Sequence, residues 1–314
     1  MNRIDRATKQ ALRERERKER SEGRRKPLEI AIPEFERRLE QLTRIHCVKY
    51  ARRDWHEAAQ RTLVEPSVKP HEKEQAARRA LSNYRPGIID SLFKLEADKR
   101  RRLAERVLEA AREDAALYAE ARRAADTHNL DIKLAPGMLA LDAETIETAL
   151  QAHVRVSALA PVLEAMQISS PSHGKLTLYL DYLELDAMPD ETCVAGEDGK
   201  PVFAPMPATQ RHEIHLLNAC SATLRAVVEV MSVAPVDAVE VLGRCHLFNP
   251  ALGELEPFPV LHLKAPHEAL VRMDLRRLEP VSAVTALGGR IDWEISRGMA
   301  PIRTDDLTVA IPVG

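Results

Sequence analysis

The chain has 314 residues, of which 45% are hydrophobic, 30% are charged and only 4% are aromatic. Its formal net charge is −2 at pH 7, and its four cysteines are scattered without CxxC spacing, which argues against a disulfide framework. No uninterrupted apolar run reaches the roughly 18 residues that a membrane helix requires. We therefore expect a cytoplasmic protein with reduced thiols and no membrane partner.

Charge is divided unevenly along the chain. Residues 1–127 contain 32 Lys and Arg against 23 Asp and Glu, whereas residues 128–314 contain 14 against 25. This asymmetry indicates either a polyanionic partner for the basic part or docking of the two parts on each other.

Residues 1–27 hold the densest positive charge and are predicted to be a basic helical arm. Their Arg, Lys, Glu, Leu and Ala favour a helix, but they lack an apolar stripe, so the helix would project into solvent or form on a partner. Its cations could neutralise nucleic-acid phosphates, or the helix could be a solvated one whose five acidic residues weaken its field. The candidate nucleic-acid-binding residues are Arg13, Arg17, Lys18, Arg20, Arg24, Arg25 and Lys26.

Residues 28–168 are predicted to be a helical region. A short extended stretch over 28–32 should precede a helix that starts at Pro33, and further helices are expected over 142–153 and 157–166. The longest periodic run predicts a helix over about 88–128, roughly 60 Å in length. That length favours an antiparallel coiled-coil hairpin with residues 33–63, or a self-association seam between protein copies.

Trp55 lies close in sequence to Tyr50, Arg52 and Arg53. These residues could form an aromatic and cationic surface. Because Trp55 falls between predicted helices, the sequence favours a core anchor with the arginines at its rim.

Residues 174–314 are predicted to be an α+β domain. Alternating apolar residues predict a strand over 175–186, and an amphipathic pattern predicts a helix over 209–231. A turn-rich insertion should occupy 191–207, and further strands are expected over 236–248, 258–264 and 290–295. The predicted fold class is thus α+β: an extended N-terminal helical, coiled-coil-like region, followed by a C-terminal domain with a small mixed β-sheet packed on helices.

One possible catalytic set lies in this acidic domain. A restriction-type nuclease core needs an acid on one strand and an acid-x-Lys on the next, to hold Mg²⁺ or Mn²⁺ and polarise water. Asp237 and Glu240 supply the first acid and Lys264 the lysine, but His262 stands where the second acid is needed. Ordinary strand-face residues produce the same pattern, so a metal-dependent nuclease or phosphoesterase is the alternative interpretation and not the main one.

The metal-binding signals are weak. Asp181 belongs to a run of carboxylates that could hold Mg²⁺ or Mn²⁺, or could simply be a solvated strand edge. His212 and His215 could hold zinc, but their spacing is one residue shorter than that of HExxH, and surface histidines explain them more simply. We therefore expect no cofactor.

The sequence does not match the nucleotide-binding motifs. The segment from Gly196 to Pro201 has a two-residue spacer where a phosphate loop has four, and proline replaces the Ser or Thr. The sequence thus favours a non-enzymatic interaction or assembly protein, with nucleic acid as a possible partner of the arm and a protein partner or self-association through the long helix.

Overall fold

The computed structural model describes residues 28–87, 95–169, 175–197, 199–249 and 252–303. The predicted arm, including all seven of its candidate phosphate-binding residues, lies outside them. Of the residues described, 52% are helical and 22% lie in strands, which confirms the predicted α+β class. Its chain divides into two compact units: residues 54–140 form the smaller one, and residues up to 53 together with those from 141 onward form the larger one.

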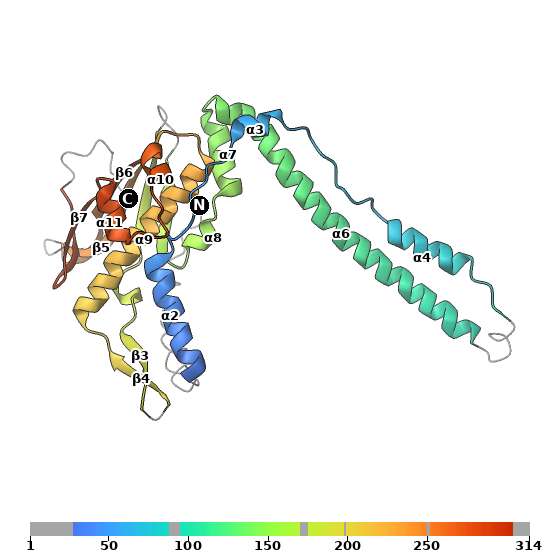
Figure 1. The fold of residues 1–314 in the computed structure, drawn as a ribbon, viewed down its shortest axis with the longest axis horizontal. Helices are drawn as coiled ribbons and strands as arrows, with labels where there is room; N and C mark the ends of the chain where they lie inside the picture. The colour runs from blue at the N-terminus through green and yellow to red at the C-terminus, as the bar shows by residue number, and fades with distance from the viewer. Residues whose placement is uncertain (1–27, 88–94, 170–174, 198, 250–251, 304–314) are drawn as a thin grey trace. The chain divides into compact units, whose positions relative to one another are not determined.

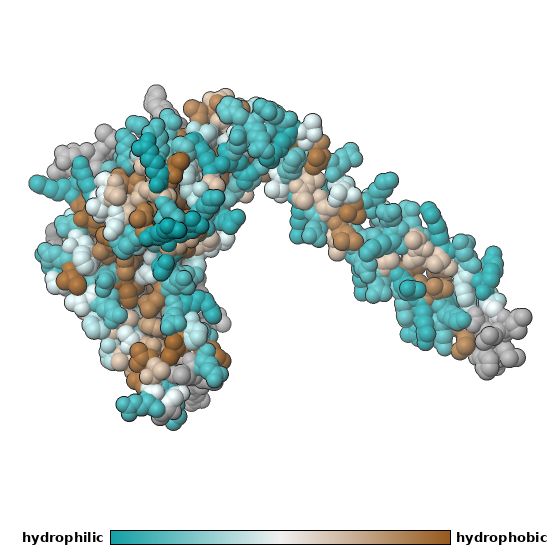
Figure 2. Space-filling model, viewed as in Figure 1, coloured by the Kyte–Doolittle hydropathy of each residue, from teal (hydrophilic) through white to brown (hydrophobic). Residues whose placement is uncertain are grey.

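The smaller unit is a helical hairpin. Its long helix α6 (Glu96–Leu139) packs against α3 (Trp55–Gln60) and α4 (Glu72–Ser82), which run antiparallel to it (Figure 1). Trp55 is only 3% exposed, which confirms its interpretation as a core anchor. Since most of α6 is exposed, the visible side of this unit is largely hydrophilic (Figure 2).

Polar side chains of α6 hydrogen-bond the backbone of the antiparallel segment that precedes α6, and so fix how the two arms of the hairpin align. The Oδ1 atom of Asn129 accepts a hydrogen bond from the amide of Val64 at 2.9 Å, and its Nδ2 donates one to the carbonyl of the same residue at 2.8 Å. Asp114, 3% exposed, accepts the amide of Glu74 at 2.8 Å and so caps the N-terminus of α4 from a neighbouring helix.

The predicted long helix is confirmed, but it starts at Glu96 and not at 88, and it ends later than the expected 128. It continues to Leu139 because Leu134, Ala135 and Met138 are buried, although Pro136 interrupts its hydrogen bonding. Its hairpin partners are α3, which lies within the expected 33–63, and α4, which lies beyond it. Self-association through α6 stays a prediction.

The larger unit contains a six-stranded mixed sheet in the order β1-β2-β5-β6-β7-β8. Neighbouring strands are antiparallel except for β2 and β5, which are parallel and are joined by a crossover that includes α9. The strands are β1 (Leu163–Ile168), β2 (Lys175–Tyr182), β5 (Ala238–Asn249), β6 (Glu254–Pro266), β7 (Arg290–Glu294) and β8 (Gly298–Ala300).

Helices of this unit surround α9, which lies against one face of the sheet (Figure 1). Both α2 and α11 pack on α9 as well. The helices are α2 (Leu28–Arg44), α7 (Ala143–His153), α8 (Val156–Leu159), the 3₁₀ turn η1 (Leu185–Ala187), α9 (Ala208–Val233), α10 (His267–Arg272) and α11 (Pro280–Ala286).

Three local predictions are wrong. β1 forms where the sequence predicts a helix, because pairing with β2 overrides the helix preference of its Leu, Glu, Ala and Met residues. The insertion over 191–207 contains a hairpin of β3 (Glu191–Ala195) and β4 (Pro201–Pro205). The first helix starts at Leu28 and includes Pro33 in its second turn.

α9 is the core helix of the larger unit. Among the described residues it is the one helix long and apolar enough to cross a membrane, and 78% of its most apolar window is buried. Tyr182, fully buried at the end of β2, contacts it through a 2.5 Å hydrogen bond between its hydroxyl and Oγ1 of Thr223. Gly243 of β5 lies beneath the Tyr182 ring, where an added Cβ would overlap the ring and hydroxyl.

Replacing Gly243 by alanine should therefore destabilise the larger unit. We expect a loss of about 1–3 kcal/mol in the free energy of unfolding, because the new methyl group forces Tyr182 out of its rotamer or away from Thr223. Denaturant titration measures the loss. Phe248→Ala, at a 63% exposed position of the same strand, is the control and should change stability by about 0.5 kcal/mol or less. An unchanged midpoint for Gly243→Ala would contradict the packing described for Tyr182.

Candidate functional site

Residues 45–53, hereafter the 45–53 segment, lie along α9 in the larger unit. The side chain of Arg225 donates to the carbonyl of Ile45 at 3.2 Å near one end of the segment. At the other end the amide of Arg53 donates to the carbonyl of Ser232 at 2.8 Å. These hydrogen bonds attach the chain between α2 and the smaller unit to the core helix.

His46 anchors the start of the segment and is only 1% exposed. Its Nε2 donates to the carbonyl of Leu278 at 3.1 Å, so Nδ1 is the acceptor of the neutral ring and receives the hydroxyl of Ser221 at 2.8 Å. The Ser221 oxygen in turn accepts the amide of His46 at 3.2 Å. Burial lowers the pKa of His46, against the opposing effect of the Leu278 carbonyl, and the neutral ring satisfies the whole network.

Tyr50 and Arg52 attach the other end of the segment to the C-terminus of α9. The Tyr50 hydroxyl donates to the carbonyl of Met231 at 3.2 Å and also lies 2.8 Å from Nδ1 of His267. Arg52 donates to the carbonyls of Ala234 and Val236 at 3.2 and 3.0 Å. A guanidinium at this position complements the partial negative charge of a helix C-terminus.

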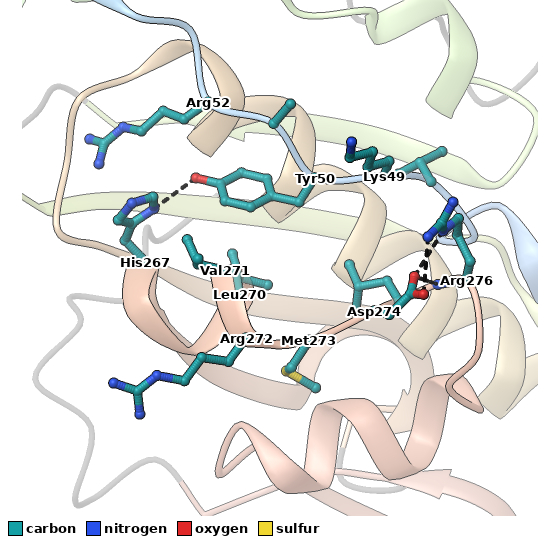
Figure 3. Close-up of a pocket in the computed structure, with 13 residues that line it drawn as sticks. Lys49, Tyr50, Arg52, His267, Leu270, Val271, Arg272, Met273, Asp274 and Arg276 are labelled. Atoms are coloured by element: carbon teal, nitrogen blue, oxygen red, sulfur yellow. Dashed lines mark hydrogen bonds and ion pairs between the residues drawn. The ribbon is translucent and has the colours of Figure 1, made fainter.

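The first pocket lies between the 45–53 segment and residues 267–276, and has a volume of about 490 Å³ (Figure 3). Leu270, Val271 and Met273 line it together with the apolar side chain of Val48. Around these apolar groups stand four basic residues of the lining: Lys49, Arg52, Arg272 and Arg276.

The second pocket lies between the 45–53 segment, the end of α7 and the C-terminal half of α9, and has a volume of about 460 Å³. It shares Val48, Lys49, Ala51 and Arg52 with the first pocket, so the 45–53 segment borders both. Its further basic residues are Arg53, Arg155 and Arg225, and Arg53 contacts Nδ1 of His153 at 3.3 Å.

The lining of the two pockets carries a marked excess of positive charge. Seven Lys and Arg residues stand against two carboxylates, and each carboxylate is already ion-paired. Glu229 lies 2.6 Å from Arg225, and Asp274 lies 2.8 Å from Arg276, which lowers the pKa of Asp274. The pockets therefore present a positive field, to which the basic residues 1–127 contribute three cations and the acidic residues 128–314 contribute four.

The predicted catalytic residues are only partly brought together. Glu240 of β5 lies directly opposite Lys264 of β6, and its Oε1 is 2.8 Å from Nε2 of His262. Asp237 is exposed, lies at a bend one residue before β5, and is outside the β5–β6 register that contains Glu240. The structure thus places the lysine opposite one of the two acids in the strand register.

The predicted metal ligands lie at separate places. Asp181 is ion-paired with Arg244 at 2.8 Å. His212 contacts the carbonyl of Ile295 at 2.9 Å, whereas the buried His215 donates from Nε2 to the carbonyl of Leu183 at 2.7 Å. Across the part of the chain that the structure describes, no three His, Cys, Asp or Glu side chains are grouped to hold a metal ion. Metal binding by these residues stays a prediction.

A partial signal for the pockets is present in the sequence. The cluster of Tyr50, Arg52 and Arg53 is conspicuous there, but its pattern favours the rim of a core anchor. In the structure only the neighbouring Trp55 is buried in a core, whereas Tyr50, Arg52 and Arg53 line the pockets. The basic residues Arg272, at the end of α10, and Arg276, after it, belong to no sequence pattern that distinguishes them from other surface arginines.

No protein-family model matches the chain, and neither a curated protein nor a solved structure matches it.

His215 should make the folded protein lose stability as the pH falls. Burial lowers the pKa of His215 from 6.5 to about 4, against the opposing effect of the Leu183 carbonyl. The unfolded chain therefore binds this proton first, and the contribution of the neutral ring to stability is full above pH 6.5. Between pH 6.5 and about 4 the free energy of unfolding should drop by about 3 kcal/mol through this residue.

Denaturant titrations of the wild type and His215→Gln between about pH 7 and pH 4 measure this drop. Glutamine keeps a donor for the Leu183 carbonyl but takes up no proton, so its profile should be flatter. Parallel profiles for the two proteins would show that His215 is not the titrating group.

Proposed function

We propose that the protein is an interaction protein that binds nucleic acid, through phosphate contacts made by the basic residues of the two pockets. The observation that carries the proposal is the excess of seven Lys and Arg over two ion-paired carboxylates around the 45–53 segment. Concave surfaces lined by one sign of charge focus the field and attract polyanions. Arg and Lys are the residues that contact phosphates most often.

The exposure of these cations supports the same proposal. Lys49 is exposed, and the side chains of Arg272 and Arg276 are 80% and 54% exposed. Arg272 has Glu268 at 3.7 Å, but that pair is fully at the surface and contributes little. Phosphates can therefore replace or join the existing partners of these side chains.

The basic arm is proposed as a second binding element. Its candidate residues, Arg13 to Lys26, precede α2 in the sequence and would add further phosphate contacts. On this proposal the arm raises affinity, and the pockets determine where the nucleic acid lies.

A metal-dependent nuclease or phosphoesterase is the second candidate function. It is favoured by one observation, the position of Glu240 directly opposite Lys264 in the β5–β6 register. Incubation with DNA and RNA in the presence of Mg²⁺ or Mn²⁺ tests it. Cleavage that is abolished in both Glu240→Gln and Lys264→Ala would favour this candidate.

Removing exposed cations from the first pocket should weaken nucleic-acid binding and reduce its salt dependence. For Lys49→Ala/Arg272→Ala we expect affinity for a labelled oligonucleotide to fall about tenfold or more. The slope of log affinity against log salt should become shallower by about 0.7–0.9 for each phosphate that the variant no longer neutralises. Fluorescence anisotropy across a salt series measures both quantities.

Arg101→Ala is the matched control, because this 80% exposed cation lies on α6 and outside both pockets. A second variant, Arg24→Ala/Arg25→Ala/Lys26→Ala, separates the contribution of the arm. If the pocket variant retains wild-type affinity and slope while the arm variant does not, the pockets are not the binding surface.

A further inference from the structure

The first pocket combines two kinds of surface that phosphate binding alone does not require. Val271 is 61% exposed although it lies among basic residues, and Met273 and Val48 add partly exposed apolar groups beside it. The second pocket has a more polar lining, which includes Ser232 and Glu229 beside Val228 and Val233. An exposed apolar surface inside a ring of cations fits a ligand that is itself part apolar and part anionic.

The aromatic residues of the first pocket are fixed in position. The Tyr50 and His267 rings meet edge to face with centroids 5.7 Å apart, and the hydroxyl of Tyr50 is held by both His267 and the Met231 carbonyl. Figure 3 shows this pair beside Val271, with Arg52 on the same side. The site is thus preorganised, which reduces the entropic cost of binding.

We infer that the first pocket binds unpaired nucleotides of single-stranded nucleic acid, an inference that rests on the proposed function. Bases and sugars would contact Val271, Met273 and the Tyr50–His267 pair, while the surrounding cations contact the phosphates. A volume of about 490 Å³ lies in the range of ordinary ligand pockets. In a duplex the bases are stacked and paired, so the apolar surface would have nothing to contact.

The second pocket continues the path of the strand. It shares the exposed residues Lys49 and Ala51 with the first pocket, and the small side chain of Ala51 leaves room for a backbone to cross the 45–53 segment. Arg53 and Arg155 would then contact the next phosphates. A strand seated in both pockets satisfies the apolar and the cationic lining together.

The test compares a single-stranded DNA of about 20 nucleotides with the duplex of the same sequence, using the full chain. We expect the single strand to bind about tenfold more tightly at equal salt. Val271→Ser should weaken single-strand binding about fivefold, the reduction expected for one apolar side chain. The variant should leave duplex binding and the salt slope unchanged, because no charge is altered.

Val194→Ser is the matched control, since Val194 is 52% exposed on β3 and outside both pockets. A thermal midpoint within error of the wild type shows that each variant is folded. Equal binding of the two DNAs, tighter binding of the duplex, or wild-type single-strand binding by Val271→Ser would overturn this inference and leave phosphate binding standing. Failure to bind either DNA would overturn the proposed function itself.

Discussion

The burial of α9 is the constraint that shapes the larger unit. The helix is enclosed by the sheet, α2 and α11, and small residues such as Ala219, Ala222 and Thr223 allow these elements to approach it closely. Where an apolar helix is buried, its polar groups need partners inside the protein, and several along α9 have one. Thr223 forms a hydrogen bond with Tyr182, and Ser221 forms one with the chain between α2 and the smaller unit. Asn218 donates one to the carbonyl of Leu42.

The candidate site follows from this same enclosure. Polar groups along α9 hold the 45–53 segment in place, and that segment forms a wall of each pocket. The carbonyls at the end of α9 fix Arg52 and Tyr50, and Tyr50 in turn meets His267 at the start of α10. Helix packing thereby places cations from separate parts of the chain around one concave surface.

The features that depend on local pattern are predictable from the sequence. Alternation along β2 identifies the buried face of Leu176, Leu178, Leu180 and Tyr182, and the apolar period identifies α9 to within two residues at each end. Local pattern does not predict β1, whose residues favour a helix until β2 supplies a pairing edge. Nor does it predict the pockets, because Tyr50 and His267 are 217 residues apart and meet only through the packing around α9.

Binding of nucleic acid in the two pockets that the 45–53 segment borders can be tested by hydrogen–deuterium exchange of the full chain, with and without a single-stranded oligonucleotide. We expect slower amide exchange over residues 45–53 and 267–276 in the complex. Protection confined to residues 1–27 or to the smaller unit, with exchange around both pockets unchanged, would contradict binding at the pockets.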